Sequence, residues 1–269
     1  MQSTDDTPEV LDVAAAGDDA DHDAGDDVGD RTGQLPALTI EVHDDIRARL
    51  AIVLDRDDLV DATRLAATVR PWFGVAKVGL ELYSAAGPDA VSAMVDLGYD
   101  VFVDLKLHDI PTTVRRAARV LGSLGARYVT LHTVGGADML RAGVEGLAEG
   151  AERAGLAAPT ALGVTVLTSE VDAPVPVLTE RVRLAIDSGC GGVICAVRDI
   201  PTIRPLGPDL VLYTPGIRMP GVSTHDQGRP ATPREAWDAG ADILGVGRTV
   251  TEADDPVVAA ADLVESITT

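Results

Sequence analysis

The feature that most constrains the fold is an alternation of two sequence patterns from residue 50 almost to the end of the chain. Short runs of β-branched and other apolar residues recur eight times: LAIVLD (50–55), VAKVG (75–79), DVFVDLK (100–106), RYVTLHT (127–133), TALGVTVL (160–167), GGVICAV (191–197), DLVLYT (209–214) and ADILGVG (241–247). Runs that are apolar throughout are typical of parallel strands buried on both faces of a sheet.

Between most of these runs, apolar residues recur at helical spacing. Such stretches cover residues 58–70, 89–98, 113–125, 138–155, 177–189 and 255–267. The gap after GGVICAV is the exception, because DIPTIRPLG holds two prolines and leaves room for one short turn. Eight strand–helix units in about 220 residues predict the α/β class and a closed (β/α)8 TIM barrel rather than an open sheet. No GxGxxG follows the first strand, which disfavours a dinucleotide-binding fold.

The first 33 residues have a different composition. They contain eleven acidic residues and one arginine, and so carry −10 of the formal net charge of −21. Such a segment cannot bury enough apolar surface to offset its chain entropy. We therefore predict a disordered acidic tail over 1–33 and a single barrel domain over 34–269. The tail is either a solvated segment or an interaction segment, and the sequence leaves both open.

Composition also limits the function and the compartment. A strongly negative chain without a basic stripe is not expected to bind nucleic acid. No apolar run approaches the roughly 18 residues of a membrane span, and the N-terminus lacks a secretion signal, so we predict a cytoplasmic protein. Cys190 and Cys195 have neither redox nor zinc spacing, and we expect two buried thiols.

In a TIM barrel the chemistry lies at the carboxyl ends of the strands and in the loops that follow them. Polar residues at these positions are Asp55, Lys77, Asp104, Lys106, Asp109, His132, Thr168, Arg218 and Arg248. We predict that this set forms the active site. For His132, a contact to a ligand and a structural role are both open.

The two lysines are the most informative members of this set. Of the 22 basic residues in the chain, only Lys77 and Lys106 are lysines. Arginine does not release a proton near neutral pH whereas lysine can, so a site that transfers a proton needs lysine. Asp104 and Lys106 are two apart on a strand and should share one face. With Lys77 and Asp109 they would form an alternating array in which the carboxylates favour the ammonium form of Lys106.

The alternative is a buried salt-bridge network that only stabilises the barrel. In this chain, such a network would more naturally use arginine.

The last two strand ends predict an anion site. GVGRT (245–249) offers glycines and Arg248, and phosphate commonly binds after strands seven and eight of such barrels. Residues 214–233 form a long Gly- and Pro-rich segment, which we interpret as a lid that carries Arg218 and Gln227 to the same phosphate. The histidines are not spaced as metal ligands, and no serine-hydrolase elbow is present.

Five motifs taken together, DLKLHDIPTT, VTVLTS, TPGIR, DQGR and GVGRTVT, resemble those of the orotidine 5′-phosphate decarboxylase family. The resemblance covers about residues 48–267. It implies a TIM-barrel lyase of pyrimidine biosynthesis that converts orotidine 5′-phosphate (OMP) to UMP and CO2 without a metal or organic cofactor. DIPTT stands where the family frequently has DIPNT, which leaves the polar contacts near Thr112 open.

The resemblance also implies a role for each matching residue. Lys106 would donate the proton to C6 of the pyrimidine, and Asp104 would crowd the substrate carboxylate. Asp55 and Lys77 would hold the ribose, and Asp109 and Thr113 would reach the neighbouring subunit's site in a homodimer. The remaining contacts would be Thr168 to the pyrimidine region and Arg218, Gln227, Gly247 and Arg248 to the phosphate.

Two other functions are open at this point. Related phosphosugar enzymes, such as 3-keto-gulonate 6-phosphate decarboxylase and hexulose-phosphate synthase, also carry a DxKxxD strand, but they need Mg2+ and lack the DIPxT continuation. A non-catalytic sensor of a phosphorylated ligand could retain the barrel, but loss of an array member would be expected in it. Lys77, Asp104, Lys106 and Asp109 are all present.

Overall fold

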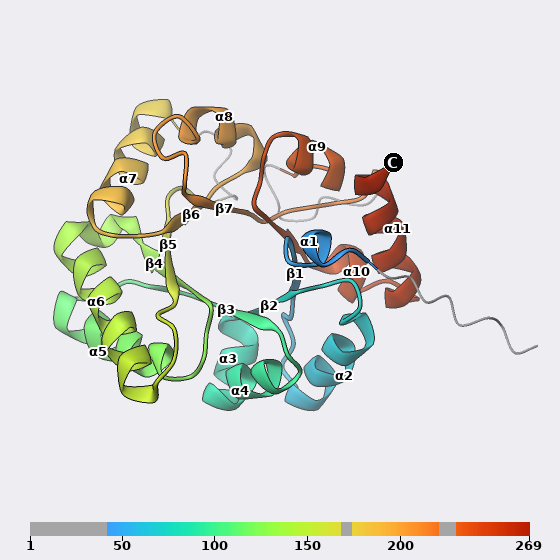
Figure 1. Cartoon of the computed structure of the whole chain (residues 1–269), viewed down its shortest axis with the longest axis horizontal. Helices are drawn as coiled ribbons and strands as arrows, with labels where there is room; N and C mark the ends of the chain where they lie inside the picture. The colour runs from blue at the N-terminus through green and yellow to red at the C-terminus, as the bar shows by residue number, and fades with distance from the viewer. Residues whose placement is uncertain (1–41, 168–173, 221–229) are drawn as a thin grey trace, which may run out of the picture. The chain divides into compact units, whose positions relative to one another are not determined.

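Eight parallel strands close into a barrel in the computed structural model, which describes residues 42–167, 174–220 and 230–269. Each strand pairs with its neighbours in sequence, and the last pairs with the first (Figure 1). The strands are β1 (Leu50–Val53), β2 (Val75–Gly79), β3 (Asp100–Leu107), β4 (Tyr128–His132), β5 (Thr160–Val164), β6 (Gly192–Ile194), β7 (Val211–Thr214) and β8 (Ile243–Val246). The predicted TIM barrel is confirmed. The predicted tail 1–33 lies outside the described residues.

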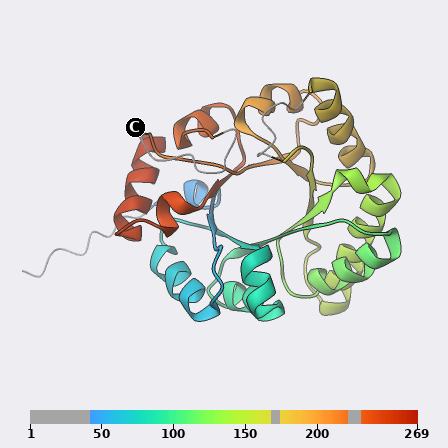
Figure 2. The ribbon, with the colours of Figure 1, turned by 180° about the vertical axis from the view of Figure 1, so that it is seen from behind.

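Helices surround the strands as an outer ring, which is visible from both ends of the barrel (Figures 1 and 2). They are α1 (Asp44–Arg47), α2 (Leu59–Val69), α3 (Leu80–Ala86), α4 (Pro88–Asp96), α5 (Pro111–Gly122), α6 (Gly136–Ala154), α7 (Val175–Asp187), α8 (Ile200–Ile203), α9 (Pro233–Asp238), α10 (Arg248–Thr251) and α11 (Pro256–Thr268), with 3-10 turns η1 (Thr133–Gly135) and η2 (Val197–Asp199). The six predicted helices are α2, α4, α5, α6, α7 and α11, and the Pro-rich gap after β6 holds only η2 and α8. None of the helices among the described residues combines the length and hydrophobicity of a membrane span.

Apolar side chains pack on both faces of the barrel wall. Inside the barrel, Phe102 and Tyr213 have ring centroids 4.7 Å apart and are surrounded by smaller residues: Ala51, Val75, Leu162, Val164, Ile194 and Ile243. A larger core fills the space between the strands and the helices. Burial on both faces explains why the strands read as continuous apolar runs. Cys190 and Cys195 are both buried thiols, as expected.

Helices α5 and α6, which follow β3 and β4, pack unusually closely. A Cβ atom on Gly150 would lie 1.9 Å from the carbonyl oxygen of Arg119, and one on Gly146 would lie 2.3 Å from that of Arg115. Only glycine allows this approach of the two backbones. The contact anchors α5 directly after the loop that leaves β3.

The carboxyl end of β3 departs from regular strand geometry. Val103 pairs with Val129 and Leu107 pairs with Leu131, so the three residues 104–106 lie opposite Thr130 alone. Within this bulge Lys106 has φ of 50°, and among the described residues it is the only non-glycine with positive φ. Such a conformation costs about 1–3 kcal/mol and is typical of functional sites. Asp104 and Lys106 both face the cavity, as expected, but the backbone between them forms this bulge and is not a regular strand.

Candidate active site

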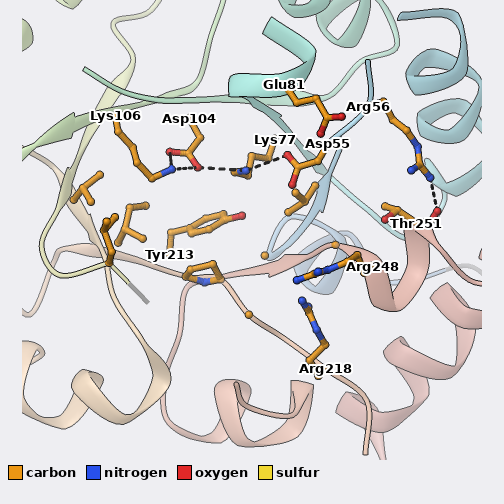
Figure 3. Close-up of a pocket in the computed structure, with 18 of the residues that line it drawn as sticks. Asp55, Arg56, Lys77, Glu81, Asp104, Lys106, Tyr213, Arg218, Arg248 and Thr251 are labelled. Atoms are coloured by element: carbon orange, nitrogen blue, oxygen red, sulfur yellow. Dashed lines mark hydrogen bonds and ion pairs between the residues drawn. The ribbon is translucent and has the colours of Figure 1, made fainter. Parts of the chain in front are cut away.

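A cavity of about 540 Å³ opens at the carboxyl ends of the strands, which is a size suited to a small-molecule ligand. Its wall contains most of the predicted site residues that the structure describes: Asp55, Lys77, Asp104, Lys106, Arg218, Gly247 and Arg248. Figure 3 shows Lys106, Asp104, Lys77 and Asp55 in a row on one side of the cavity and Arg218 and Arg248 on another.

The first side is a continuous chain of alternating charges. Lys106 Nζ lies 3.0 Å from Oδ1 and 2.9 Å from Oδ2 of Asp104. Lys77 Nζ lies 3.3 Å from Oδ2 of Asp104 and 3.6 Å from Oδ1 of Asp55. The observed order is thus Asp55–Lys77–Asp104–Lys106 (Figure 3), and we call these four residues the charged array. The expected array ran Lys77–Asp104–Lys106–Asp109; in the structure it extends beyond Lys77 to Asp55, and Asp109 accepts from the backbone N–H of Ile110 instead.

Asp104 is the buried centre of the charged array, with 9% of its side chain exposed. Burial raises the pKa of this carboxyl, but Lys77, Lys106 and hydrogen bonds from Lys106 and Thr130 lower it by more, so its pKa lies below the usual value. The carboxylate therefore stays ionised. Lys106 is the more open cation, with 34% of its side chain exposed against 13% for Lys77.

A glycine next to the charged array leaves space for it. A Cβ atom on Gly79, the last residue of β2, would lie 2.8 Å from Oδ1 of Asp55 and 3.1 Å from Nζ of Lys77. A larger residue here would displace the end of the Asp55 side chain. Glycine at the end of β2 therefore leaves space for the Asp55 and Lys77 side chains.

The second side of the cavity is built from two arginines whose guanidinium groups point toward each other (Figure 3). Arg218 is buried, and its Nη1 donates to the carbonyl oxygen of Ile217 at 2.8 Å. Its backbone is held by Ala231, whose carbonyl oxygen accepts from Arg218 N at 2.9 Å. Arg248 begins α10, which is only four residues long and adds little dipole. Two converging guanidinium groups are complementary to a dianion such as a phosphate.

The cavity wall also contains apolar residues, Val53, Val164, Val166, Leu167, Ile194 and Pro215, and the ring of Tyr213. Burial, followed by the nearby carboxylates of Asp104 and Asp55, raises the pKa of the Tyr213 phenol well above its usual value, so the hydroxyl stays protonated. A Cβ atom on Gly245 would lie 2.3 Å from this hydroxyl oxygen, so glycine gives the ring its room. This wall suits the face of an uncharged planar ring.

Other predicted residues lie away from the cavity wall or outside the described residues. Asp109 is exposed, and its Oδ1 accepts from the backbone N–H of Ile110 at 2.6 Å. Thr113 is exposed on α5. His132 accepts from the N–H of Val134 through Nδ1. Thr168 and Gln227 lie outside the described residues.

The structure also adds residues that the sequence interpretation missed: Arg56, Glu81, Tyr213 and Thr251 in the cavity wall and Thr130 behind it. Arg56 directly follows Asp55, and its guanidinium binds the carbonyl of Thr251 and pairs with Asp61 at 3.2 Å. The strand-end rule could have found Arg56. Glu81 lies in α3, a helix that the pattern did not predict.

Comparisons with known proteins agree with this geometry. Residues 48–263 match the sequence pattern of the "Orotidine 5'-phosphate decarboxylase / HUMPS family". The chain is 42% identical over 223 residues to an orotidine 5′-phosphate decarboxylase of Anaeromyxobacter sp. (strain K), covering 79% of this chain and 95% of that protein. It is 45% identical over 227 residues to the enzyme of that name from Nitratidesulfovibrio vulgaris (strain DP4), covering 79% and 94%.

Solved structures give the same result. The orotidine 5′-phosphate decarboxylase of Lactobacillus acidophilus superposes with a TM-score of 0.69 at 31% identity, covering 82% of this chain and 99% of that chain. An uncharacterized conserved protein from Geobacillus kaustophilus gives a TM-score of 0.67 at 32% identity, covering 81% and 99%. With the family pattern spanning the whole barrel and relatives above 40% identity, the chain belongs to the orotidine 5′-phosphate decarboxylase / HUMPS family.

Proposed function

We propose that this protein converts orotidine 5′-phosphate to UMP and CO2, with Lys106 as the proton donor to C6 of the pyrimidine. One observation supports this most: the charged array and the arginine pair line one cavity, which also contains apolar residues and the ring of Tyr213. Curated relatives of 41–45% identity carry the name of this activity.

The position of Lys106 fits the chemistry of the reaction. Breaking the bond between C6 and the carboxylate leaves an electron pair on C6, in the plane of the ring. An ammonium group beside that atom stabilises the pair and then donates a proton, so that a C–H bond forms as an N–H bond breaks. Lys106 is partly exposed at the cavity, so its amine regains a proton from solvent after each turnover.

Asp104 contributes through repulsion. A substrate carboxylate placed beside Lys106 also lies close to Asp104, because the ammonium is within 3.0 Å of both Asp104 oxygens. The two carboxylates repel each other in the bound substrate, and the repulsion disappears as CO2 leaves. Lys77 lies 3.3 Å from Oδ2 of Asp104 and so helps to keep the carboxylate in place.

The remaining groups bind the parts of the substrate that do not react. In the proposed orientation, Asp55 and Lys77 bind the ribose hydroxyls, and Arg218, Gly247 and Arg248 bind the phosphate. Binding energy from the remote phosphate orients the reacting end next to Lys106. Contacts of Thr168 to the pyrimidine region and of Gln227 to the phosphate stay predictions from the sequence.

The working unit is proposed to be a homodimer in which Asp109 and Thr113 reach the partner's site. Both residues are exposed, as is Ile110 between them, so all three are accessible to a partner subunit. The cytoplasmic location likewise stays a prediction from the sequence.

The direct test is to follow the loss of OMP absorbance in metal-free buffer with EDTA. The proposal expects full turnover, with UMP and CO2 as products. A Mg2+-dependent phosphosugar enzyme would leave OMP unchanged and act on its own substrate only after metal is restored. A sensor would bind OMP or UMP without consuming it, and that result would contradict the proposal.

A further inference from the structure

The strand bulge that carries Lys106 is tied to Asp104 by one side chain, that of Thr130 on β4. Thr130 is the single β4 residue opposite residues 104–106, and it is fully buried. Its Oγ1 accepts a hydrogen bond from the backbone N–H of Lys106 at 2.8 Å and lies 3.1 Å from Oδ1 of Asp104. One hydroxyl thus contacts the two residues that are closest to the proposed reaction.

The direction of these two hydrogen bonds follows from the groups involved. The backbone N–H of Lys106 is only a donor, so the Thr130 oxygen must accept from it. An ionised carboxylate is only an acceptor, so the Thr130 proton must point to Asp104. The Thr130 hydroxyl can bond to both partners at once only in this orientation. The Lys106 N–H and the Asp104 carboxylate therefore select the same Thr130 rotamer.

The Lys106 end of this link is strained. Lys106 has φ of 50°, a conformation that L-residues rarely adopt, and its N–H points to a side chain instead of a neighbouring strand's carbonyl. A bulge of this kind needs a partner for the displaced N–H group, and Thr130 supplies it.

The Asp104 end is equally restricted. Oδ1 of Asp104 receives Thr130 and Lys106, and Oδ2 receives Lys106 and Lys77. Without the Thr130 hydroxyl, Oδ1 would keep only Lys106, and the carboxylate could rotate with the flexible lysine. The distance between Asp104 and a substrate carboxylate would then vary.

We propose that Thr130 is a positioning residue for the decarboxylation: its hydroxyl locks the Lys106 bulge and the Asp104 carboxylate into one geometry. The inference rests on the proposed function of the site. Thr130 does not contact the substrate in this proposal. Loss of its hydroxyl should therefore lower kcat and leave ligand binding at Arg218 and Arg248 nearly unchanged.

The test compares Thr130→Val, which removes the hydroxyl at nearly constant volume, with Thr130→Ser, which keeps it. We expect kcat to fall about 100-fold in Thr130→Val, with KM and the UMP dissociation constant within about threefold of the wild type. Thr130→Ser should keep kcat within about fivefold. Should valine prevent folding, Thr130→Ala, which adds no atoms, takes its place with the same expected loss.

Thr165 provides a matched control. Its hydroxyl is also fully buried at the same end of the barrel, and it donates to the carbonyl of Ile194 at 2.8 Å. Thr165→Val should lower stability as much as Thr130→Val, with kcat within about threefold of the wild type.

Two results would overturn the inference: a Thr130→Val or Thr130→Ala enzyme with near wild-type kcat, or a Thr130→Ser enzyme as slow as Thr130→Val. A wild-type protein that does not consume OMP would instead refute the proposed function, so the two failures are distinguishable.

Discussion

Three aspartates at the ends of strands pair with different cations: Asp242, before β8, pairs with an arginine, whereas Asp55 and Asp104, at the carboxyl ends of β1 and β3, pair with lysines. At the amino ends of the strands, Arg204 pairs with Asp242 at 2.8 Å and also donates to the carbonyls of Leu210 and Gly240 at 2.8 and 3.0 Å. Arg49 lies over the ring of Trp237 there and donates to the carbonyl of Ala241 at 2.6 Å. At the carboxyl ends, Asp104 and Asp55 pair with Lys77 and Lys106 instead.

The difference indicates what each end requires. A guanidinium has five donors in a fixed fork, so one arginine can join several carbonyls and a carboxylate and hold loops together. An ammonium is compact, sits on a flexible stem and can give up its proton. Because 20 of the 22 basic residues are arginine, the two lysines at the cavity support the proposed proton transfer, whereas Arg49 and Arg204 at the amino ends join structural groups.

The largest effect is expected at Lys106. Both Lys106→Ala and Lys106→Arg should lower kcat about 10⁴-fold or more, because alanine removes the charge and arginine keeps it without a proton to give. Steady-state OMP turnover measures the loss. Binding of UMP within about threefold of the wild type is the control for folding. A Lys106→Arg enzyme of near wild-type activity would show that charge alone is sufficient.

The next test asks whether the carboxyl end, unlike the amino end, is completed by a partner subunit. Lys106→Ala and Asp109→Ala chains should each be inactive, and equal mixing after subunit exchange should restore about a quarter of wild-type activity. Half of the dimers are then hybrids, and each hybrid has one intact site of two. Hybrids that form, as shown by mass spectrometry of differently tagged chains, but remain inactive would contradict a shared site.

Arginine at the cavity should behave as a binding group. Arg248→Ala should lower kcat/KM for OMP about 10- to 100-fold, mainly through KM, since it removes charge-assisted hydrogen bonds to the phosphate. With orotidine, which lacks the phosphate, the variant and the wild type should have equal kcat/KM. If the defect persists with orotidine, Arg248 does not act on the phosphate.

The smallest effect on activity is expected at the amino end. Arg204→Lys should leave kcat within about twofold of the wild type and lower the free energy of unfolding by about 1–2 kcal/mol, because lysine cannot reach all the carbonyls that Arg204 joins. Urea denaturation and OMP turnover of the same preparation measure both quantities. A large loss of kcat without a loss of stability would remove the distinction between the two ends.

Much of this contrast follows from local sequence. The strands could be predicted because both faces of a barrel strand are buried, so runs such as LAIVLD are apolar throughout. The strand-end rule then found Asp55, Lys77, Asp104 and Arg248 at the cavity without any knowledge of their partners. The six longer helices were found by their apolar spacing, whereas α3 and α10 are too short to show a period.

What the sequence did not predict depends on contacts between distant segments. At the bulge, the N–H of Lys106 donates to Thr130, 24 residues later, and a threonine in an apolar strand gives no sign of that contact. Asp55 joins the charged array because Gly79 leaves room for the Asp55–Lys77 pair. Such features are set by tertiary packing and follow no local period.

The central claim is that a primary amine at position 106 transfers a proton, and aminoethylation of a Lys106→Cys variant tests it most directly. The native thiols should not compete, because burial raises the pKa of Cys190 to about 12 and Cys195 is fully buried. Bromoethylamine converts the new cysteine into a side chain of lysine length that ends in an amine. Iodoacetamide, which adds a neutral amide, is the control.

We predict that aminoethylation raises OMP turnover about 100-fold or more above the unmodified variant, while the amide raises it not at all. Equal recovery with both reagents, or no recovery after complete aminoethylation of a protein that still binds UMP, would contradict the account.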